Sequence, residues 1–310
     1  MKTRDRGVRL TGLEGVLVAA ATPRRAQEYS IDLGATLELV DFLGESEARG
    51  IVLLASVGEF VHFALDDRRH MVNFAVKRSR LPLLVNVSCS TLDGAVELAR
   101  EAAFAGVAGV FLMPPYYFPY SQESICSFYL NFAEAVGDAA PIYLCNTPAF
   151  TSRISAATAI QLLATGLFAG IEESGGSLDD LASLADQSRQ RPFTLLAGCE
   201  RVYVQAKALG ALGVVSGIAC AVPELVVALD QALRTGATER IPQLQARVVQ
   251  FLDWTEQLPF PVGIKEAAKE RKLKMGAAAV PLGENGDRKR EAFREWFRGW
   301  LPDVLRECRP

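Results

Sequence analysis

Short apolar runs rich in β-branched residues recur along the chain at intervals of roughly 20 to 35 residues. Most of these runs are continuous rather than alternating, which is typical of parallel strands covered on both faces. We expect eight strands, at residues 16–22, 51–56, 81–88, 110–115, 141–147, 168–174, 194–200 and 214–219. This rhythm predicts a series of repeated βα units.

The segments between the expected strands carry apolar residues at helical spacing. In residues 33–50 one predicted helix face holds Leu33, Leu37, Val40 and Leu43. Two later helices have expected N-caps, Thr91 and Ser121. Three glycines are expected to end helices before the next strand: Gly50, Gly106 and Gly210.

The strand signal stops near residue 223, and three helical stretches follow at residues 223–236, 240–258 and 261–308. This tail is too long to be only the eighth helix of a barrel. We therefore predict a TIM (β/α)8 barrel over residues 1–222, after a short N-terminal tail to about residue 12. The remaining residues, 223–310, are predicted to form a C-terminal helical extension that includes the last barrel helix.

The chain of 310 residues is 50% hydrophobic and has a net charge of -3, which argues against nucleic acid as the main partner. The N-terminus lacks an apolar signal segment and no run suits a bilayer span, so we expect a cytoplasmic protein without membrane contact. The six cysteines show no CxxC motif, and His62 and His70 are too far apart for a one-turn metal pair. We expect no metal and no cofactor.

In a TIM barrel the functional residues gather at the C-terminal ends of the strands. The predicted strand ends form a hydroxyl-rich mouth with three carboxylates, Glu172, Glu173 and Glu200, and without lysine or histidine. Because successive strand residues point to opposite faces, Glu173 should face the helices and have a structural role. Glu172 is expected to act as an acid, a base or a ligand contact, or alternatively to form a salt bridge with a basic residue such as Arg153.

Five segments carry a resemblance that goes beyond the fold. They are TP at 22–23, ASVGEFVHFALDDR at 55–68, PPYYFPYSQESI at 114–125, YLCNTPAFT at 143–151 and LPFPVGIKEAAKE at 258–270. In this order, over roughly residues 13–276, they resemble the dihydrodipicolinate synthase/N-acetylneuraminate lyase family. The resemblance implies a pyruvate-type aldolase on a TIM barrel, usually a tetramer, in which pyruvate forms an imine with a lysine at the end of the sixth strand.

The resemblance also implies a relay of three hydroxyl groups and a turn, GTTGE, whose backbone amides hold the substrate carboxylate. In that turn Ser56 keeps a hydroxyl, Val57 keeps only its backbone N–H, and Gly58 is retained. Tyr117 fits the tyrosine that the family supplies across a dimer. Cys145 stands where the relay tyrosine of the YNxP motif is expected.

The expected imine lysine falls on Glu172, and a carboxylate cannot form an imine. The arginine expected to bind a second substrate carboxylate falls on Phe150, so dihydrodipicolinate synthesis itself is not expected. The segment GIKEAAKE contains Lys265 and Lys269, but it follows the eighth strand. Their spacing of one turn indicates a solvated helix face rather than a catalytic site.

Three other features have two interpretations each. Cys145 is either a nucleophile or a small polar filler, since no strand-end histidine is present to activate it. His62 either contacts ligand or faces solvent or an interface. The basic C-terminal stretch either binds an anionic partner or forms an amphipathic helix that packs through Phe293, Trp296, Phe297 and Trp300.

Two functions remain open at this stage. A diverged lyase for a small oxo- or hydroxy-acid, working without an imine, would use as catalytic residues Glu172, Tyr117, Ser56 and Cys145. A non-catalytic binding or sensing protein would retain only a pocket for a small carboxylic acid. In both cases the expected ligand contacts are Val57, Gly58, Asn146, Ser174 and Gly198, in a homodimer or homotetramer.

Overall fold

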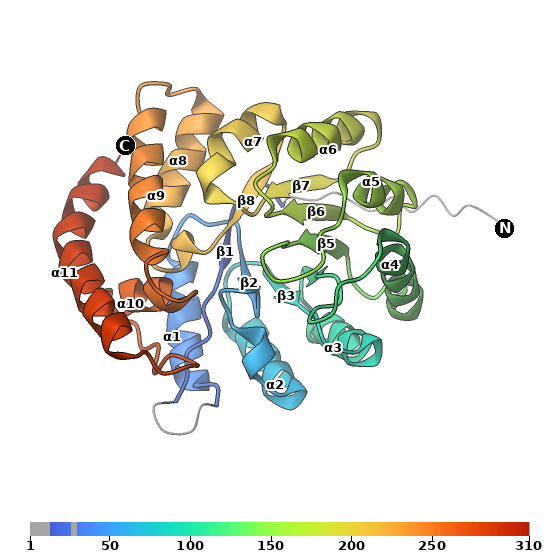
Figure 1. Cartoon of the computed structure of the whole chain (residues 1–310), viewed down its shortest axis with the longest axis horizontal. Coiled ribbons are helices and arrows are strands. Elements are labelled where there is room, and N and C mark those ends of the chain that lie inside the picture. Colours follow the sequence, from blue (N-terminus) through green and yellow to red (C-terminus); the bar gives the residue numbers. More distant parts are fainter. Residues whose placement is uncertain (1–12, 26–29, 310) are drawn as a thin grey trace.

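The computed structural model describes residues 13–25 and 30–309. Eight parallel strands form a closed barrel and follow one another in chain order (Figure 1). The strands are β1 Gly15–Ala19, β2 Gly50–Leu53, β3 Leu83–Asn86, β4 Gly109–Leu112, β5 Ile142–Asn146, β6 Gly170–Glu173, β7 Thr194–Ala197 and β8 Gly213–Ser216. Each strand overlaps a run where one was expected, although β1, β2, β4 and β8 begin one residue earlier, so the predicted TIM barrel is confirmed.

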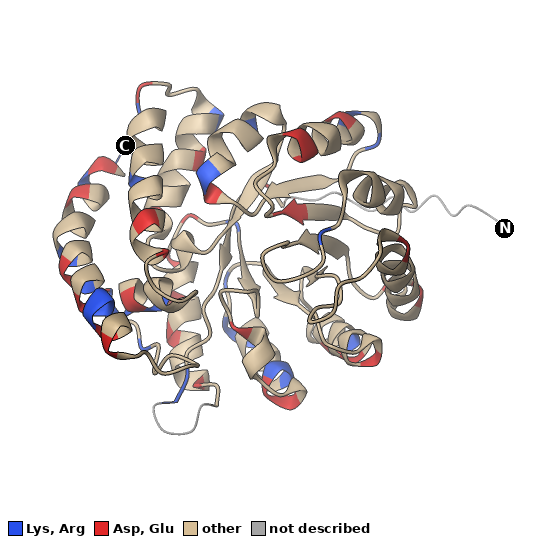
Figure 2. Ribbon diagram, viewed as in Figure 1, with Lys and Arg blue, Asp and Glu red and all other residues tan. Residues whose placement is uncertain are grey.

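Every residue of these strands is buried. One face of each strand fills the barrel interior and the other lies under the surrounding helices, which explains the continuous apolar runs. Figure 2 shows that the charged residues lie mainly on the helices. An exception is the C-terminal end of β6, which is acidic. Within the described ranges, no helix is both long enough and apolar enough to cross a membrane.

In the described ranges, eight helices surround the barrel: α1 Leu33–Gly44, α2 Leu65–Arg78, α3 Leu92–Ala105, α4 Gln122–Val136, α5 Ala156–Ala164, α6 Leu178–Gln190, α7 Tyr203–Leu209 and α8 Pro223–Thr235. Short 3₁₀ helices follow three of the strands: η1 Phe60–His62, η2 Glu200–Val202 and η3 Ile218–Cys220. The predicted N-caps are confirmed, since the Thr91 side chain accepts a bond from Gly94 N and Ser121 accepts one from Ser124 N.

Two details of the helix predictions need correction. Gly106 and Gly210 end α3 and α7 as expected, but Gly50 is the first residue of β2, because α1 already ends at Gly44. The buried face of α1 is also rotated from the predicted one. It consists of Ala35, Thr36, Leu39, Val40 and Leu43, whereas Leu33 and Leu37 are only half-buried.

The C-terminal extension continues with α9 Ile241–Thr255, α10 Val262–Glu270 and α11 Glu284–Glu307, which lie with α8 on one side of the barrel (Figure 1). The last predicted stretch therefore contains two helices instead of one. The amphipathic interpretation of α11 is confirmed: Phe293, Phe297 and Trp300 are buried, and Trp296 stacks on Trp254 with ring centroids 5.0 Å apart. A division into two domains at residue 222 stays a prediction.

The prediction of a solvated face at Lys265 is wrong. Lys265 is 2% exposed, and its Nζ donates a 2.5 Å hydrogen bond to Oε2 of Glu59, in the turn after β2. Burial lowers the pKa of Lys265, while the Glu59 carboxylate opposes this shift. Lys269, one turn later, is half-buried and bonds Glu266 at 2.7 Å. The spacing therefore identified a helix but not the side that packs on the barrel.

Candidate active site

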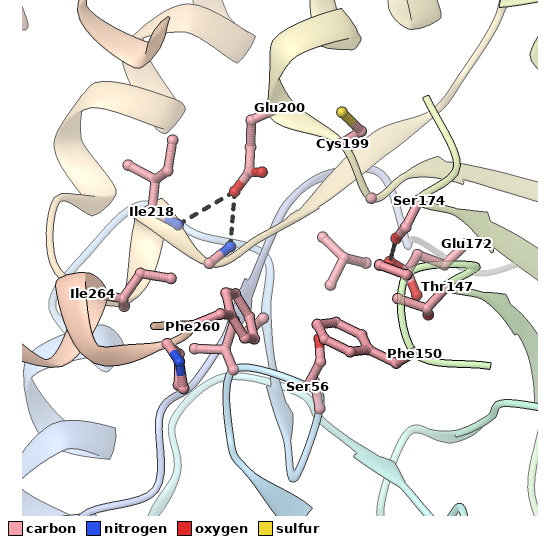
Figure 3. A pocket seen from close by; sticks show the side chains of 18 of the residues that line it. Ser56, Thr147, Phe150, Glu172, Ser174, Cys199, Glu200, Ile218, Phe260 and Ile264 are labelled. Atoms are coloured by element: carbon pink, nitrogen blue, oxygen red, sulfur yellow. Dashed lines mark hydrogen bonds between the residues drawn. The ribbon is translucent and has the colours of Figure 1, made fainter. Parts of the chain in front are cut away.

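A cavity of about 450 Å³ is lined by residues at the C-terminal ends of the strands (Figure 3). The turn after β2 and the start of α10 complete its wall. Most of the lining is apolar and includes Val52, Phe111, Met113, Ile218, Phe260 and Ile264. The polar lining comes chiefly from Ser56, Thr147, Glu172, Ser174, Glu200 and Arg201. A largely apolar cavity with a few converging polar groups is the usual form of a small-molecule site.

Glu172, the third residue of β6, faces this cavity and is 8% exposed. Its Oε2 accepts a 2.6 Å hydrogen bond from the thiol of Cys145 on β5, and its Oε1 accepts one from the hydroxyl of Ser174. Burial raises the pKa of Glu172, the two hydrogen bonds oppose this, and the negative charge of Glu200 adds to it. Glu172 therefore keeps a proton to higher pH than an exposed glutamate does.

Gly198, just after β7, makes room for this carboxyl group. A Cβ atom at this position would lie 2.0 Å from Glu172 Oε1 and 1.9 Å from Ser174 Oγ. Any other residue would have to displace both groups. Gly198, predicted as a ligand contact, thus lines the cavity and also sets the position of Glu172.

Cys145 is buried, and burial raises the pKa of its thiol well above the ordinary value, with the Glu172 carboxylate adding to the shift. A thiol with a raised pKa is a poor nucleophile at neutral pH. Its sulfur also lies 3.2 Å from Thr147 Oγ1. These contacts favour the second interpretation of Cys145, a small polar residue that holds its neighbours in place.

Glu173 and Asn146 lie outside the cavity lining. Asn146 Nδ2 donates to Glu173 Oε2 at 2.6 Å, and Asn146 also exchanges two hydrogen bonds with the backbone of Ile154. The other oxygen of Glu173 accepts from the backbone N–H of Gly175 at 2.7 Å. Glu173 therefore has the structural position that the strand alternation predicted, and Asn146 is engaged in the same network.

No salt bridge joins Glu172 to Arg153 in the described part of the chain, because Arg153 hydrogen-bonds Asp180 on α6. Among the described residues that line the cavity there is no lysine, and Arg201 is the one basic residue. The Arg201 guanidinium is already paired with two acidic residues at the end of α9. Glu172 thus faces the cavity without a counter-ion of its own there.

The turn after β2 contains three consecutive backbone N–H groups with no acceptor in the described ranges. They belong to Ser56, Val57 and Gly58, and of these residues Ser56 and Val57 line the cavity. Gly58 does not line the cavity itself, but it permits the tight turn: a Cβ there would lie 2.9 Å from Leu54 Cα. Consecutive unpaired N–H groups form a suitable place for a carboxylate.

Glu200 is a site residue that the sequence analysis did not assign, although it lies at a strand end. It is the first residue of η2, three positions after the last residue of β7. Its Oε1 accepts from Ser216 Oγ at 2.9 Å, Gly217 N at 2.9 Å and Ile218 N at 3.3 Å (Figure 3). Burial raises the pKa of Glu200 as well. Its place at the end of a predicted strand was the available signal.

Tyr117 does not line the cavity. It is 88% exposed, its backbone has a φ of 82°, and its ring packs edge-on against Phe118 with centroids 4.8 Å apart. A positive φ is uncommon for a bulky residue. His62 is exposed beside a smaller hollow formed with Tyr116 and Phe150. Tyr117 is therefore not placed to contact a ligand in the cavity of its own chain.

The sequence profile of the dihydrodipicolinate synthetase family matches residues 12–298. The chain belongs to this family. A 4-hydroxy-tetrahydrodipicolinate synthase from Chlorobium limicola is 30% identical over 258 residues, which cover 81% of this chain and 85% of that protein. The family resemblance deduced from the motifs is thereby confirmed.

Solved structures of dihydrodipicolinate synthetase-like proteins have the same fold. YagE, a prophage protein of this family from E. coli K12 solved in complex with pyruvate, superposes with a TM-score of 0.86 at 23% identity, over 93% of this chain and 99% of its own. A catalytic lysine mutant of Ruminococcus gnavus sialic acid aldolase superposes with a TM-score of 0.84 at 17% identity, over 94% of this chain and 97% of its own.

Proposed function

We propose that this family member is a diverged lyase that acts on a small oxo- or hydroxy-acid without forming an imine. The observation that carries the proposal is Glu172: a buried carboxyl group with a raised pKa, at the end of β6, facing a cavity. None of the described residues that line this cavity is a lysine. A carboxyl group whose pKa is raised by burial is suited to accept and return a proton.

The substrate carboxylate would be held by the backbone N–H groups of Ser56 and Val57, which have no other acceptor in the described ranges. In the cleavage direction, the Glu172 carboxylate accepts the proton of a hydroxyl group while the carbon–carbon bond beside it breaks. The bonding pair passes into the enolate of the oxo-acid, and Glu172 returns the proton to the enolate carbon. The Ser56 hydroxyl, also on the cavity wall, would donate to the enolate oxygen.

Cys145 and Ser174 are assigned to positioning in this mechanism. Both donate hydrogen bonds to Glu172, so they fix the direction of its carboxyl group and stabilise its ionised form. Tyr117 takes part only if a second copy of the chain supplies it. Its exposure and positive φ support a homodimer or homotetramer in which this segment is covered.

The test is a turnover assay with a panel of small 2-oxo acids and of 4-hydroxy-2-oxo acids, run on wild-type protein, Glu172→Gln and the surface control Glu97→Gln. We expect turnover by wild type and the control, and a loss of at least about a hundredfold in Glu172→Gln. Treatment with pyruvate and borohydride should leave every lysine unmodified in mass spectrometry. A pyruvate adduct on Lys265 or any other lysine would overturn the mechanism.

The second candidate, a binding or sensing protein, is favoured by one observation. The relay tyrosine implied by the family is replaced by Cys145, and Tyr117 lies outside the cavity of its own chain, so no tyrosine lines that cavity among the described residues. Such a protein would bind a small acid without turnover. Binding that persists unchanged in Glu172→Gln, with no product formed, would select this candidate over the lyase.

A further inference from the structure

The short helix η2 is held in place from two sides. On the barrel side, the carboxyl group of Glu200 accepts hydrogen bonds from Ser216, the last residue of β8, and from the next two backbone N–H groups. On the other side, α9 of the C-terminal extension contacts the main chain of η2 and the side chain of Arg201. The position of Glu200 therefore depends on a helix that is not one of the eight around the barrel.

Gln245, the fifth residue of α9, makes the contact with the main chain of η2. Its Nε2 donates to the carbonyl oxygen of Glu200 at 3.3 Å and to that of Arg201 at 3.0 Å. Its Oε1 is buried and has no hydrogen-bond partner in the described ranges. The polar contribution of Gln245 in this part of the chain therefore comes from Nε2. Removing this donor would leave two carbonyl groups of η2 without it.

The second contact between α9 and η2 is open to solvent. The Arg201 guanidinium donates to Asp253 and Glu256, but these three side chains are 34%, 59% and 61% exposed. Ion pairs exposed to this degree contribute little to stability. The partly buried hydrogen bonds of Gln245 are less open to competition from water, so they hold η2 more firmly.

The position of Glu200 matters for Glu172. The charge of Glu200 adds to the effect of burial in raising the pKa of Glu172, and burial raises the pKa of Glu200 itself. The interaction between two like charges weakens with distance and with access to water. A movement of η2 that exposes Glu200 would therefore lower the pKa of both carboxyl groups.

Resting on the proposed function for the role of Glu172, we propose that Gln245 is a positioning residue of the site. By holding two carbonyl groups of η2, it keeps the Glu200 carboxyl group buried and within reach of the charge on Glu172. Gln245 does not line the cavity, so it acts on Glu172 only through Glu200. The C-terminal extension thereby controls the protonation of an acid on β6.

The test is a carbon NMR titration of the carboxyl resonances of Glu172 and Glu200, which needs no ligand. Each resonance is assigned by its loss in Glu172→Gln or Glu200→Gln. Gln245→Met keeps the length of the side chain and removes the donor, so it should lower the pKa of both groups toward the ordinary 4.5, by about 0.5 or more. The control Gln161→Met changes an exposed glutamine of α5 outside the cavity and should leave both values unchanged.

A double variant separates positioning from general loosening of the fold. In a Glu200→Gln background the charge through which Gln245 acts is gone, so Gln245→Met should no longer change the pKa of Glu172. A full effect in this background would overturn the inference, because Gln245 would then act independently of Glu200. An unchanged or raised pKa of Glu172 in the single variant would overturn it as well. If Gln245→Met does not fold, Gln245→Asn gives the same test, since its amide is one methylene too short to reach both carbonyl groups.

This inference and the proposed function fail in different ways. The expected NMR result without turnover of any small oxo- or hydroxy-acid would retain the role of Gln245 and remove the lyase. Turnover that depends on Glu172, together with an unchanged titration in folded Gln245→Met, would retain the lyase and remove the role of Gln245.

Discussion

The thiol of Cys145 donates a 2.6 Å hydrogen bond to Oε2 of Glu172. These are the two positions where the family resemblance implies a relay tyrosine and an imine lysine, and they contact each other directly across β5 and β6. The acid at one position is therefore accompanied by a hydrogen-bond donor at the other. The hydrogen bond from Cys145 lowers the free-energy cost of burying the Glu172 carboxylate.

The first prediction concerns this pair. Replacing Cys145 with alanine removes a donor that stabilises the ionised form of Glu172, so the pKa of Glu172 should rise further. We expect the Glu172 carboxyl resonance in carbon NMR to titrate at higher pH in Cys145→Ala than in wild type. Cys145→Ser keeps a donor and should lie near wild type. A lower or unchanged pKa in Cys145→Ala would contradict the assignment.

Gly198→Ala tests the space around the same carboxyl group. The added Cβ would lie 2.0 Å from Glu172 Oε1, so the Glu172–Ser174 contact must shift. We expect a loss of about 1–3 kcal/mol in the free energy of unfolding, measured with urea, and loss of ligand binding. Gly299 of α11 has no atoms within 4 Å of an added Cβ, so the control Gly299→Ala should stabilise the protein by about 0.5–1 kcal/mol. Equal effects of the two changes would count against a tight site at Gly198.

The buried Glu59–Lys265 pair predicts strong coupling. Lys265→Met leaves Glu59 buried, and Arg24, 3.7 Å away, is then its nearest cation among the described residues. The change should cost about 3–5 kcal/mol. Glu59→Gln should cost a similar amount, because it leaves the ammonium buried. The double variant should lose much less than the sum of the two in a urea double-mutant cycle. Simple additivity would show that the two groups do not stabilise each other.

The C-terminal helices predict a specific acid sensitivity. Arg298 and then Arg294 hold the pKa of Glu270 at about 2, against an ordinary value of 4.5. A lowered folded-state pKa contributes stability above the ordinary value, and this contribution is lost as pH falls from about 4.5 toward 2. Glu270→Gln should therefore cost about 2 kcal/mol at neutral pH, after discounting for the exposed Arg298, and little near pH 2. The same cost at both pH values would contradict this.

The barrel could be predicted because each strand is recognisable from a short stretch of neighbouring residues. Each parallel strand is buried on both faces, so each one reads as a continuous apolar run, and strand order in a TIM barrel follows the chain. The alternation of side chains along β6 likewise separated Glu172 from Glu173 correctly, since one lines the cavity and the other bonds Asn146. These inferences needed only the identity of neighbouring residues.

Other features depend on segments distant in the chain. The burial of Lys265 follows from Glu59, which is 206 residues earlier, and nothing in the helical spacing reports on that partner. The backbone amides that fix Glu200 belong to the loop after β8, so its role appears only when the strands are side by side. Phe260 and Ile264 line the cavity because the segment before α10 and the first turn of this helix lie against the barrel mouth.

The contact between Lys265 and Glu59 joins the C-terminal extension to the turn that presents Ser56 and Val57 to the cavity. Phe260, Pro261, Gly263 and Ile264 also form part of the cavity wall. The barrel and the C-terminal extension thus both contribute to the site. A chain cut after residue 222 would keep Glu172 and Glu200 but lose the part of the cavity wall that the extension supplies. The helical extension therefore supports one wall of the pocket. A change that weakens the packing of α10 on the barrel should also weaken ligand binding.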